Sequence, residues 1–185
     1  MERESDELLY DRYLKKHGEE DLRILFSRHG KKLTLFLFGF VGDMRDAEEL
    51  MLDAFAAAAA GKTPFFGKSS FKTWLYAIAR RKALMFLRKK KVRTVPADEL
   101  PLAGDPEADA ALLAAERNAG LYRAMERLSA DYRQVLFLLY FEEMSYEEIG
   151  RVTFKSRKQL YHLAERAKAA LKKELEQAGF SGEML

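Results

Sequence analysis

The chain has 185 residues, of which 48% are hydrophobic and 33% charged, and this fits one medium or two small domains of an ordinary globular protein. Its formal net charge is only +3, and the absence of cysteine excludes disulfides and thiolate metal sites and suits a reducing cytoplasm, where we expect the protein to be located. The N-terminus lacks signal-peptide character and the longest apolar run, 33–41, is too short to span a bilayer, so we expect no membrane insertion.

Almost the whole chain predicts α-helix, because Val, Ile and Thr are sparse and no segment alternates apolar and polar residues over the length of a strand. In the first half, Gly18, Gly42 and the stretch 61–67 separate the helices. We expect four helices there, over residues 6–16, 20–41, 44–60 and 69–91.

The third of these helices begins with a strongly acidic stretch. Residues 43–53 contain five acidic side chains and one arginine. We interpret paired carboxylates such as Glu48-Glu49 as part of a solvated or docking face rather than as a catalytic pair.

The fourth helix lies in a stretch of the opposite charge. Between Gly67 and Ala97 there are ten Lys and Arg residues and no Asp or Glu, with aromatic residues among them. Such a surface attracts phosphate backbones, and the rings offer stacking platforms for unpaired bases. Taken alone, the stretch fits a solvated basic helix equally well.

A helical projection of this segment separates two faces. The apolar face is expected to carry Phe71, Trp74, Leu75, Ile78 and Met85. The other is expected to carry Thr73, Ala77, Arg80, Arg81 and Arg88. Trp74 is either an anchor in the core or a nucleic-acid contact.

An acidic, proline-containing segment then divides the chain. Residues 98–116 hold six acidic side chains and no basic one, and three of the four prolines lie between 96 and 106. Because prolines interrupt helices and this stretch can bury little, we predict a flexible linker over 94–105. Asp105-Pro106 is typical of a helix start, so the sequence predicts two small helical domains, residues 1–93 and 106–185.

The second half contains two capping boxes, Ser145-Tyr146-Glu147-Glu148 and Ser156-Arg157-Lys158-Gln159. We expect helices over 106–128, 130–141, 145–152 and 156–177, the last two joined by a tight turn. This is the geometry of a helix-turn-helix, whose second helix reads base edges in the major groove. The two helices should be held together by Ile149, Val152, Leu160, Leu163 and Ala167, together with Leu136 and Leu139.

These segments resemble those of bacterial RNA polymerase sigma factors of the extracytoplasmic-function (ECF) group, in the sigma-70 family. Gly42-Asp43 followed by Asp46-Ala47-Glu48-Glu49-Leu50 is similar to the family's acidic docking helix. The stretch Trp74-Leu75-Tyr76-Ala77-Ile78-Ala79-Arg80 is similar to its W-L-x-x-I-A-R stretch, and Ser145-Tyr146-Glu147-Glu148-Ile149 to its second conserved region. The resemblance covers about residues 8–93 and 112–176.

The resemblance implies an all-α fold with region two over 1–93, the linker over 94–105 and region four, a winged-helix-like helix-turn-helix domain, over 106–185. Core RNA polymerase would dock on Asp43, Asp46, Glu48, Glu49, Leu50, Asp53 and Phe55. The minus-ten promoter element would be opened and read by Phe65, Phe66, Lys68, Ser69, Lys72, Trp74, Arg80 and Arg81. The minus-thirty-five element would be read by Lys155, Ser156, Arg157, Lys158, Gln159, Tyr161, His162 and Arg166.

The implied partners are core RNA polymerase and promoter DNA, both as duplex and as the melted non-template strand, and an anti-sigma protein is a further partner to be tested. No cofactor or metal is expected.

Other functions were weighed against this one. An enzyme is disfavoured, because His17, His29 and His162 are far apart, none has a metal-ligand spacing, and no Gly-rich phosphate loop is present. A helix-turn-helix transcription regulator that is not a polymerase subunit explains residues 130–173 equally well, but not the acid-free helix at 69–91. A sigma-like protein that has lost initiation activity is a third alternative.

Overall fold

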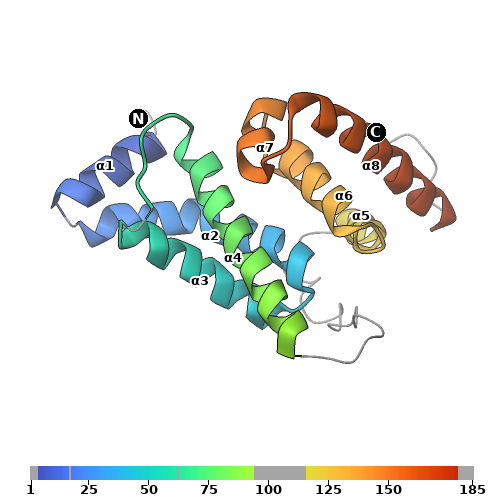
Figure 1. Ribbon diagram of the computed structural model, residues 1–185, viewed down its shortest axis with the longest axis horizontal. Helices are drawn as coiled ribbons and strands as arrows, with labels where there is room; N and C mark the ends of the chain where they lie inside the picture. Colours follow the sequence, from blue (N-terminus) through green and yellow to red (C-terminus); the bar gives the residue numbers. More distant parts are fainter. Residues whose placement is uncertain (1–3, 17, 62, 94–115, 179–185) are drawn as a thin grey trace. The chain divides into compact units, whose positions relative to one another are not determined.

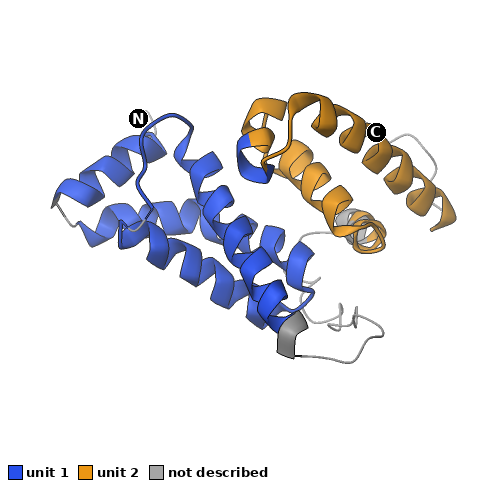
Figure 2. Ribbon diagram, viewed as in Figure 1, with its two compact units in different colours: residues 1–102, 151–153 blue, residues 103–150, 154–185 orange. Residues whose placement is uncertain are grey.

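The computed structural model of the protein describes residues 4–16, 18–61, 63–93 and 116–178. Among these residues the secondary structure is helical throughout, and none lies in a strand. Two compact units divide the chain (Figure 2): residues 1–102 with 151–153, and residues 103–150 with 154–185. The predicted linker at 94–105 and the predicted helix start at Asp105-Pro106 lie outside the described residues.

The first unit is built from α1 (Asp6–Lys16), α2 (Glu19–Val41), α3 (Met44–Ala59) and α4 (Phe71–Arg93), which follow one another in blue to green in Figure 1. The long helix α2 packs against the other three. Its fully buried side chains include Leu25, Leu33 and Leu37. Because this stripe repeats at helical spacing, α2 forms one side of the core against which the functional helices α3 and α4 rest.

The junction between α2 and α3 is specified locally. Gly42 adopts the left-handed conformation (φ 69°) and its N–H donates to the carbonyl oxygen of Phe38. Only glycine takes this conformation without a Cβ penalty, and it ends helices for that reason. Asp43 then caps α3 by accepting a hydrogen bond from the N–H of Asp46 (2.9 Å). The acidic stretch therefore begins at a defined position.

The remaining helices are α5 (Glu116–Glu126), α6 (Ala130–Leu136), the π-helix η2 (Phe137–Phe141), α7 (Tyr146–Thr153) and α8 (Arg157–Gln177). The sequence predicted one helix over 130–141, and the structure differs in that its last turn widens to π geometry. In the wider turn the N–H of Glu142 donates to the carbonyl oxygen of Phe137, and the rings of Phe137 and Phe141 stack (5.2 Å, 17°).

The other predicted helices are confirmed with ends that shift by one or two residues, and within the described part of the second half the first helix ends at Glu126 rather than at residue 128. No helix in the part of the chain that the structure describes is long and apolar enough to cross a membrane.

Candidate functional site

The acidic stretch of α3 is largely exposed. Asp43, Glu48, Glu49 and Asp53 are exposed and Asp46 is half-buried. Asp46, Glu49 and Asp53, at spacings of three and four residues, share one side of the helix and present a negative surface there, whereas Glu48 projects from another side.

Two residues expected on the docking face are instead part of the core. Leu50 and Phe55 are 6% and 5% exposed, and the ring of Phe55 packs against that of Phe26 on α2 (5.0 Å). Phe55 lies on the side of α3 that meets α2, whereas Leu50 lies on the side that faces α4. In the described fold they hold α3 in place, while the acids face outwards.

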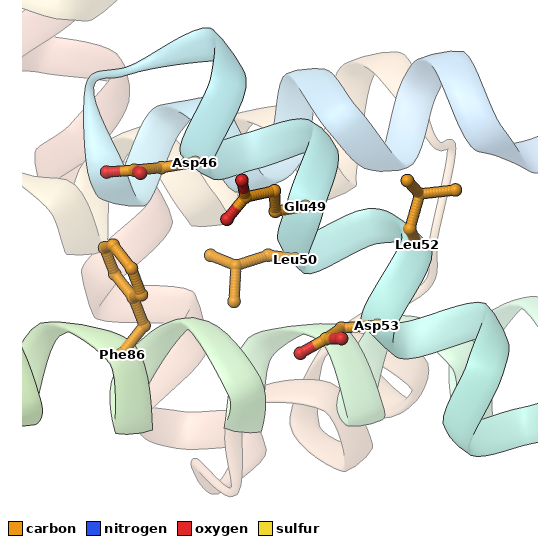
Figure 3. Close-up of a pocket in the computed structure, with 6 residues that line it drawn as sticks. All are labelled: Asp46, Glu49, Leu50, Leu52, Asp53 and Phe86. Carbon is orange, nitrogen blue, oxygen red and sulfur yellow. The ribbon is translucent and has the colours of Figure 1, made fainter.

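A hollow lies between α3 and α4 beside this face (Figure 3). It is lined by Asp46, Glu49, Leu50, Leu52, Asp53 and Phe86. At the edges of the hollow, two lysines of α4 form ion pairs with acids of α3. Lys82 Nζ lies 3.6 Å from Asp53 Oδ2, and Lys90 Nζ lies 3.4 Å from Asp46 Oδ2. Such exposed pairs contribute little to stability and exchange readily with a partner's charges. Acids around an apolar floor suit a partner surface that is both basic and apolar.

The basic helix α4 presents its charge differently from the helical projection. Arg81 and Arg88 are exposed as expected, and Arg80 is half-buried. Met85, expected on the apolar side, is 52% exposed, and Thr73, expected on the opposite side, is 1% exposed. Both expectations are wrong because α4 packs against α1, α2 and α3, so its buried sector is wide at the start of the helix and is rotated away from Met85.

An aromatic cluster lies where α4 begins. The ring of Trp74 packs against Phe65 (5.3 Å) and Tyr10 (5.2 Å), and its indole Nε1 is buried without a hydrogen-bond partner. Phe65 belongs to the same cluster, while its neighbour Phe66 is 76% exposed. Of the two phenylalanines predicted to read the minus-ten element, the structure therefore packs one, half-buried, against the aromatic cluster and leaves the other accessible.

The residues that follow complete the exposed part of the loop. Gly67 has a left-handed backbone (φ 66°), Lys68 is exposed, and Ser69 and Lys72 are half-buried. The structure thus brings Phe66, Lys68 and Ser69 onto one loop directly before α4, an aromatic ring beside a cation and a hydroxyl.

The first turn of α4 is capped from two directions. Ser70 accepts a hydrogen bond from the N–H of Thr73 through its hydroxyl (3.2 Å). Glu7 of α1 accepts one from the N–H of Phe71 (2.8 Å), 64 residues away in the chain. Sequence reasoning did not identify Glu7, because nothing local to it indicates a partner so distant.

Charged contacts fasten α1 to α2. Asp6 accepts hydrogen bonds from Arg28 (2.7 Å) and contacts His29 Nε2 (2.5 Å). Burial would raise the pKa of Asp6, but the hydrogen bonds from His29 and Arg28 outweigh it and lower that pKa to about 2. Arg12 pairs with both Glu4 and Asp21.

In the second half, both predicted capping boxes are present. The Ser145 hydroxyl and the Glu148 side chain reciprocally cap α7, and the Ser156 hydroxyl and the Gln159 side chain do the same for α8. Phe154, which ends α7, has a left-handed backbone (φ 59°) and is 70% exposed.

The apolar residues expected to hold the helix-turn-helix together are largely buried. Six of the seven residues are buried and Leu139 is half-buried.

The exposed face of α8 is the candidate reading surface. Arg157, Lys158, Tyr161, His162 and Arg166 are exposed at its N-terminal half. Lys158, His162 and Arg166, at spacings of four residues, lie along one side of the helix, and Arg157 and Tyr161, also four residues apart, lie on the adjoining side.

Three other residues predicted to read DNA have their own partners in the protein. Lys155 Nζ lies 3.5 Å from Asp131 Oδ2. Gln159 Oε1 accepts from the N–H of Ser156 (2.8 Å), and the Ser156 hydroxyl accepts from the N–H of Gln159 (3.3 Å). A bidentate contact of Gln159 with adenine would require its amide oxygen to leave this bond.

Within the described residues, no group of His, Asp or Glu side chains is arranged to hold a metal ion. The described part of the chain is thus an all-helical protein with a helix-turn-helix, one acidic face and two separate basic surfaces of the kind suited to nucleic acid.

Comparison with known proteins specifies the family. A model of sigma-70 region 2 matches residues 25–93, and a model of sigma-70 region 4 matches residues 119–171. The chain belongs to the sigma-70 family, in the ECF group. It is an RNA polymerase sigma factor that directs transcription initiation, a non-enzymatic role, and it binds core polymerase and promoter DNA. This decides against the separate transcription regulator.

Individual relatives agree. The chain is 28% identical to the RNA polymerase sigma-H factor of Pseudomonas aeruginosa over 165 residues, covering 82% of this chain and 84% of that protein. It is 26% identical to the sigma factor YlaC of Bacillus subtilis over 160 residues, with 84% and 92% covered.

Among solved structures, CnrH in complex with the cytosolic domain of CnrY matches the fold with a TM-score of 0.68 at 22% identity, covering 94% of this chain and 99% of that one. The sigma factor RpoE in complex with the anti-sigma factor NepR from Bartonella quintana matches with a TM-score of 0.67 at 20% identity, with 85% and 98% covered.

Proposed function

We propose that this sigma factor directs polymerase to a particular promoter class through three separate surfaces. The polymerase clamp docks on α3, the loop before α4 and the exposed side of α4 open and read the minus-ten element, and the N-terminal half of α8 reads the minus-thirty-five element. The observation that carries the proposal is the segregation of charge: the acids of α3 face outwards, whereas α4 and α8 carry exposed cations that include Arg81, Arg88, Arg157, Lys158 and Arg166.

The docking surface consists of Asp46, Glu49 and Asp53, which line the hollow between α3 and α4, together with the exposed Asp43 and Glu48. Leu50 forms part of its floor, and Phe55 supports α3 from the core. Acidic side chains steer a basic partner and define its register, while the apolar floor supplies area to bury.

Minus-ten opening falls to the loop and to α4. An extruded base needs a ring to stack on and hydrogen-bonding groups at its edges, at a cost of a few kcal/mol for unstacking. Phe66, Lys68 and Ser69 provide the ring, a cation and a hydroxyl. Lys72, Arg80 and Arg81 contact the phosphate backbone of the promoter DNA. Phe65 and Trp74 act from the aromatic cluster as support for the loop.

Minus-thirty-five reading falls mainly to Arg157, Lys158, Tyr161 and His162, which are exposed on α8. Arg and Lys pair with guanine in the major groove, and an aromatic ring can contact a thymine methyl group. Arg166 and Lys155 reach phosphates. Ser156 and Gln159 set the start of the helix through their capping box and so orient the reading residues.

We further propose a cytoplasmic location, where polymerase and promoter DNA are found, and an anti-sigma protein as a regulatory partner. The similarity in fold to a sigma factor solved in complex with its anti-sigma factor supports a search for such a partner.

The test is run-off transcription with bacterial core polymerase on genomic DNA of the source organism, with and without the protein. New discrete start sites that need the protein, with shared sequences upstream, support the proposal. Arg157→Ala with Lys158→Ala should weaken promoter use without reducing polymerase binding. Glu49→Lys should instead reduce polymerase binding and leave the DNA-reading surfaces intact. Equal loss of polymerase binding in both contradicts the division of labour, and polymerase binding without new starts indicates a sigma-like protein that has lost initiation activity.

A further inference from the structure

We infer that Glu7 and Tyr10 of α1 are positioning residues for minus-ten opening. Both precede residue 25, where the match to region 2 begins, so this role lies in a part of the chain that the family comparison does not cover. The inference rests on the proposed function of the loop before α4.

Glu7 acts on the start of the reading helix. The first N–H groups of an α-helix have no partner within the helix, and the helix dipole favours a negative charge there. The Glu7 carboxylate supplies a hydrogen-bond acceptor and a negative charge at this point, since its Oε1 accepts from the N–H of Phe71 at 2.8 Å. Ser70 caps the same turn by accepting from the N–H of Thr73. The point from which α4 projects is therefore fixed by a side chain of α1.

Tyr10 holds the loop at both ends. Its hydroxyl donates to the carbonyl oxygen of Ala58 (2.8 Å), in the last turn of α3 before the loop. Its ring contacts Phe65 within the loop (5.8 Å) and Phe71 directly after it (5.0 Å). Tyr10 is 1% exposed, so these contacts are made in the core.

The consequence is a pre-organised loop. Phe65 is anchored on Tyr10, and the next residue, Phe66, is thereby presented to solvent together with Lys68 and Ser69. A loop already held in its binding shape loses less conformational freedom when it captures a base than a loose one does. Glu7 and Tyr10 thus act on opening through the loop, without touching DNA.

Glu7 is not needed to attach α1 to the rest of the unit. Asp6 bonds to Arg28 and contacts His29, and Arg12 pairs with Asp21, so three other contacts, made by two side chains of α1, join it to α2. The bond of Glu7 goes instead to α4. Removal of its carboxylate should therefore alter the start of α4 more than the attachment of α1.

The experiment compares full-length Glu7→Ala and Glu7→Gln with the wild type, and uses Asp11→Ala as the matched control on the exposed side of α1. Promoter opening is followed by permanganate reactivity of minus-ten thymines, and core-polymerase affinity is measured in parallel, both well below the melting temperature. Glu7→Ala should slow opening about tenfold, as expected for loss of a charge-assisted hydrogen bond, with polymerase affinity unchanged within about twofold. Glu7→Gln should recover most of the rate, because its amide oxygen can still accept from Phe71.

Opening by Glu7→Ala at the wild-type rate, or a parallel loss of polymerase affinity, overturns the inference. Glu7→Asp is a second variant in case Glu7→Ala does not fold, because it keeps the charge but shortens the reach by one methylene. Promoter opening by Glu7→Asp at the wild-type rate also overturns the inference. Failure of the wild type itself to open any promoter contradicts the proposed function instead, so the two failures are distinguishable.

Discussion

The two helices that carry the basic reading residues begin in different ways. Helix α8 is capped by its own neighbours, Ser156 and Gln159, three residues apart. Helix α4 takes part of its cap from Glu7 and rests on a ring from Tyr10, both more than sixty residues earlier. The start of α8 is thus specified by four consecutive residues, whereas the cap of α4 is complete only once α1 has packed. Changes in α1 should therefore affect α4 and leave α8 unaffected.

The largest effect is expected for Tyr10→Ala. Removal of a buried ring that contacts Phe65, Phe71 and Trp74 should cost about 3–5 kcal/mol in the free energy of unfolding of the first unit. Amide hydrogen exchange should show loss of protection in α4 and none in α8. Tyr10→Phe, which loses only the bond to Ala58, is the control and should cost about 1 kcal/mol. Equal loss of protection in both helices would contradict the comparison.

Acid should weaken the first unit through Asp6. Its pKa is lowered from 3.8 to about 2, so this carboxylate stabilises the fold above about pH 4, and the contribution is lost as pH falls towards 2. A shift of this size corresponds to about 2 kcal/mol. Urea unfolding followed through α1 and α2 at pH 5 and pH 2.5 measures it. Asp6→Asn should remove this part of the pH dependence, and an unchanged pH profile in that variant argues against the assignment.

The capping box of α8 gives a smaller effect. Ser156→Ala should destabilise the helix-turn-helix by about 1 kcal/mol, detected as faster exchange in the first turn of α8. Gln159→Glu keeps the capping box, so stability and base preference at the minus-thirty-five element should both be retained. A changed base preference in Gln159→Glu, measured on a randomised minus-thirty-five library, would show that Gln159 reads DNA directly.

The smallest effect concerns the turn before α8. Phe154 holds a left-handed backbone that costs about 1 kcal/mol or more in a residue with a Cβ. Phe154→Gly removes this cost but adds freedom to the unfolded chain, so a net gain of about 0.5 kcal/mol is expected. Thermal melting measures it, and a lower melting temperature would mean that the exposed ring of Phe154 has a stabilising contact.

Local signals made most of the fold predictable. The glycine at 42, the caps at Asp43, Ser145 and Ser156, and the apolar spacing at helical intervals each depend on residues within a few positions of one another. The helix bounds and the helix-turn-helix core followed from them. The widening of the helix to η2 did not, because no single residue type marks a π-turn.

The site was less predictable because burial depends on tertiary packing. Phe65 and Phe66 are adjacent and identical in type, yet only contact with Tyr10 decides which one is anchored. Met85 was placed on the wrong face, since the projection of a single helix does not show how many neighbours surround it. The role of Glu7 required knowledge that α1 and the start of α4 meet.

Gly150 determines how closely α7 and the turn before α8 approach each other. A methyl group at this position would lie 3.1 Å from the carbonyl oxygen of Lys155 and 3.6 Å from Leu160, so a larger residue would require the turn to shift by a few tenths of an ångström. Helix α8 begins directly after this turn, and its reading side chains lie in its N-terminal half. The direction in which they point therefore depends on a residue of α7 that carries no Cβ.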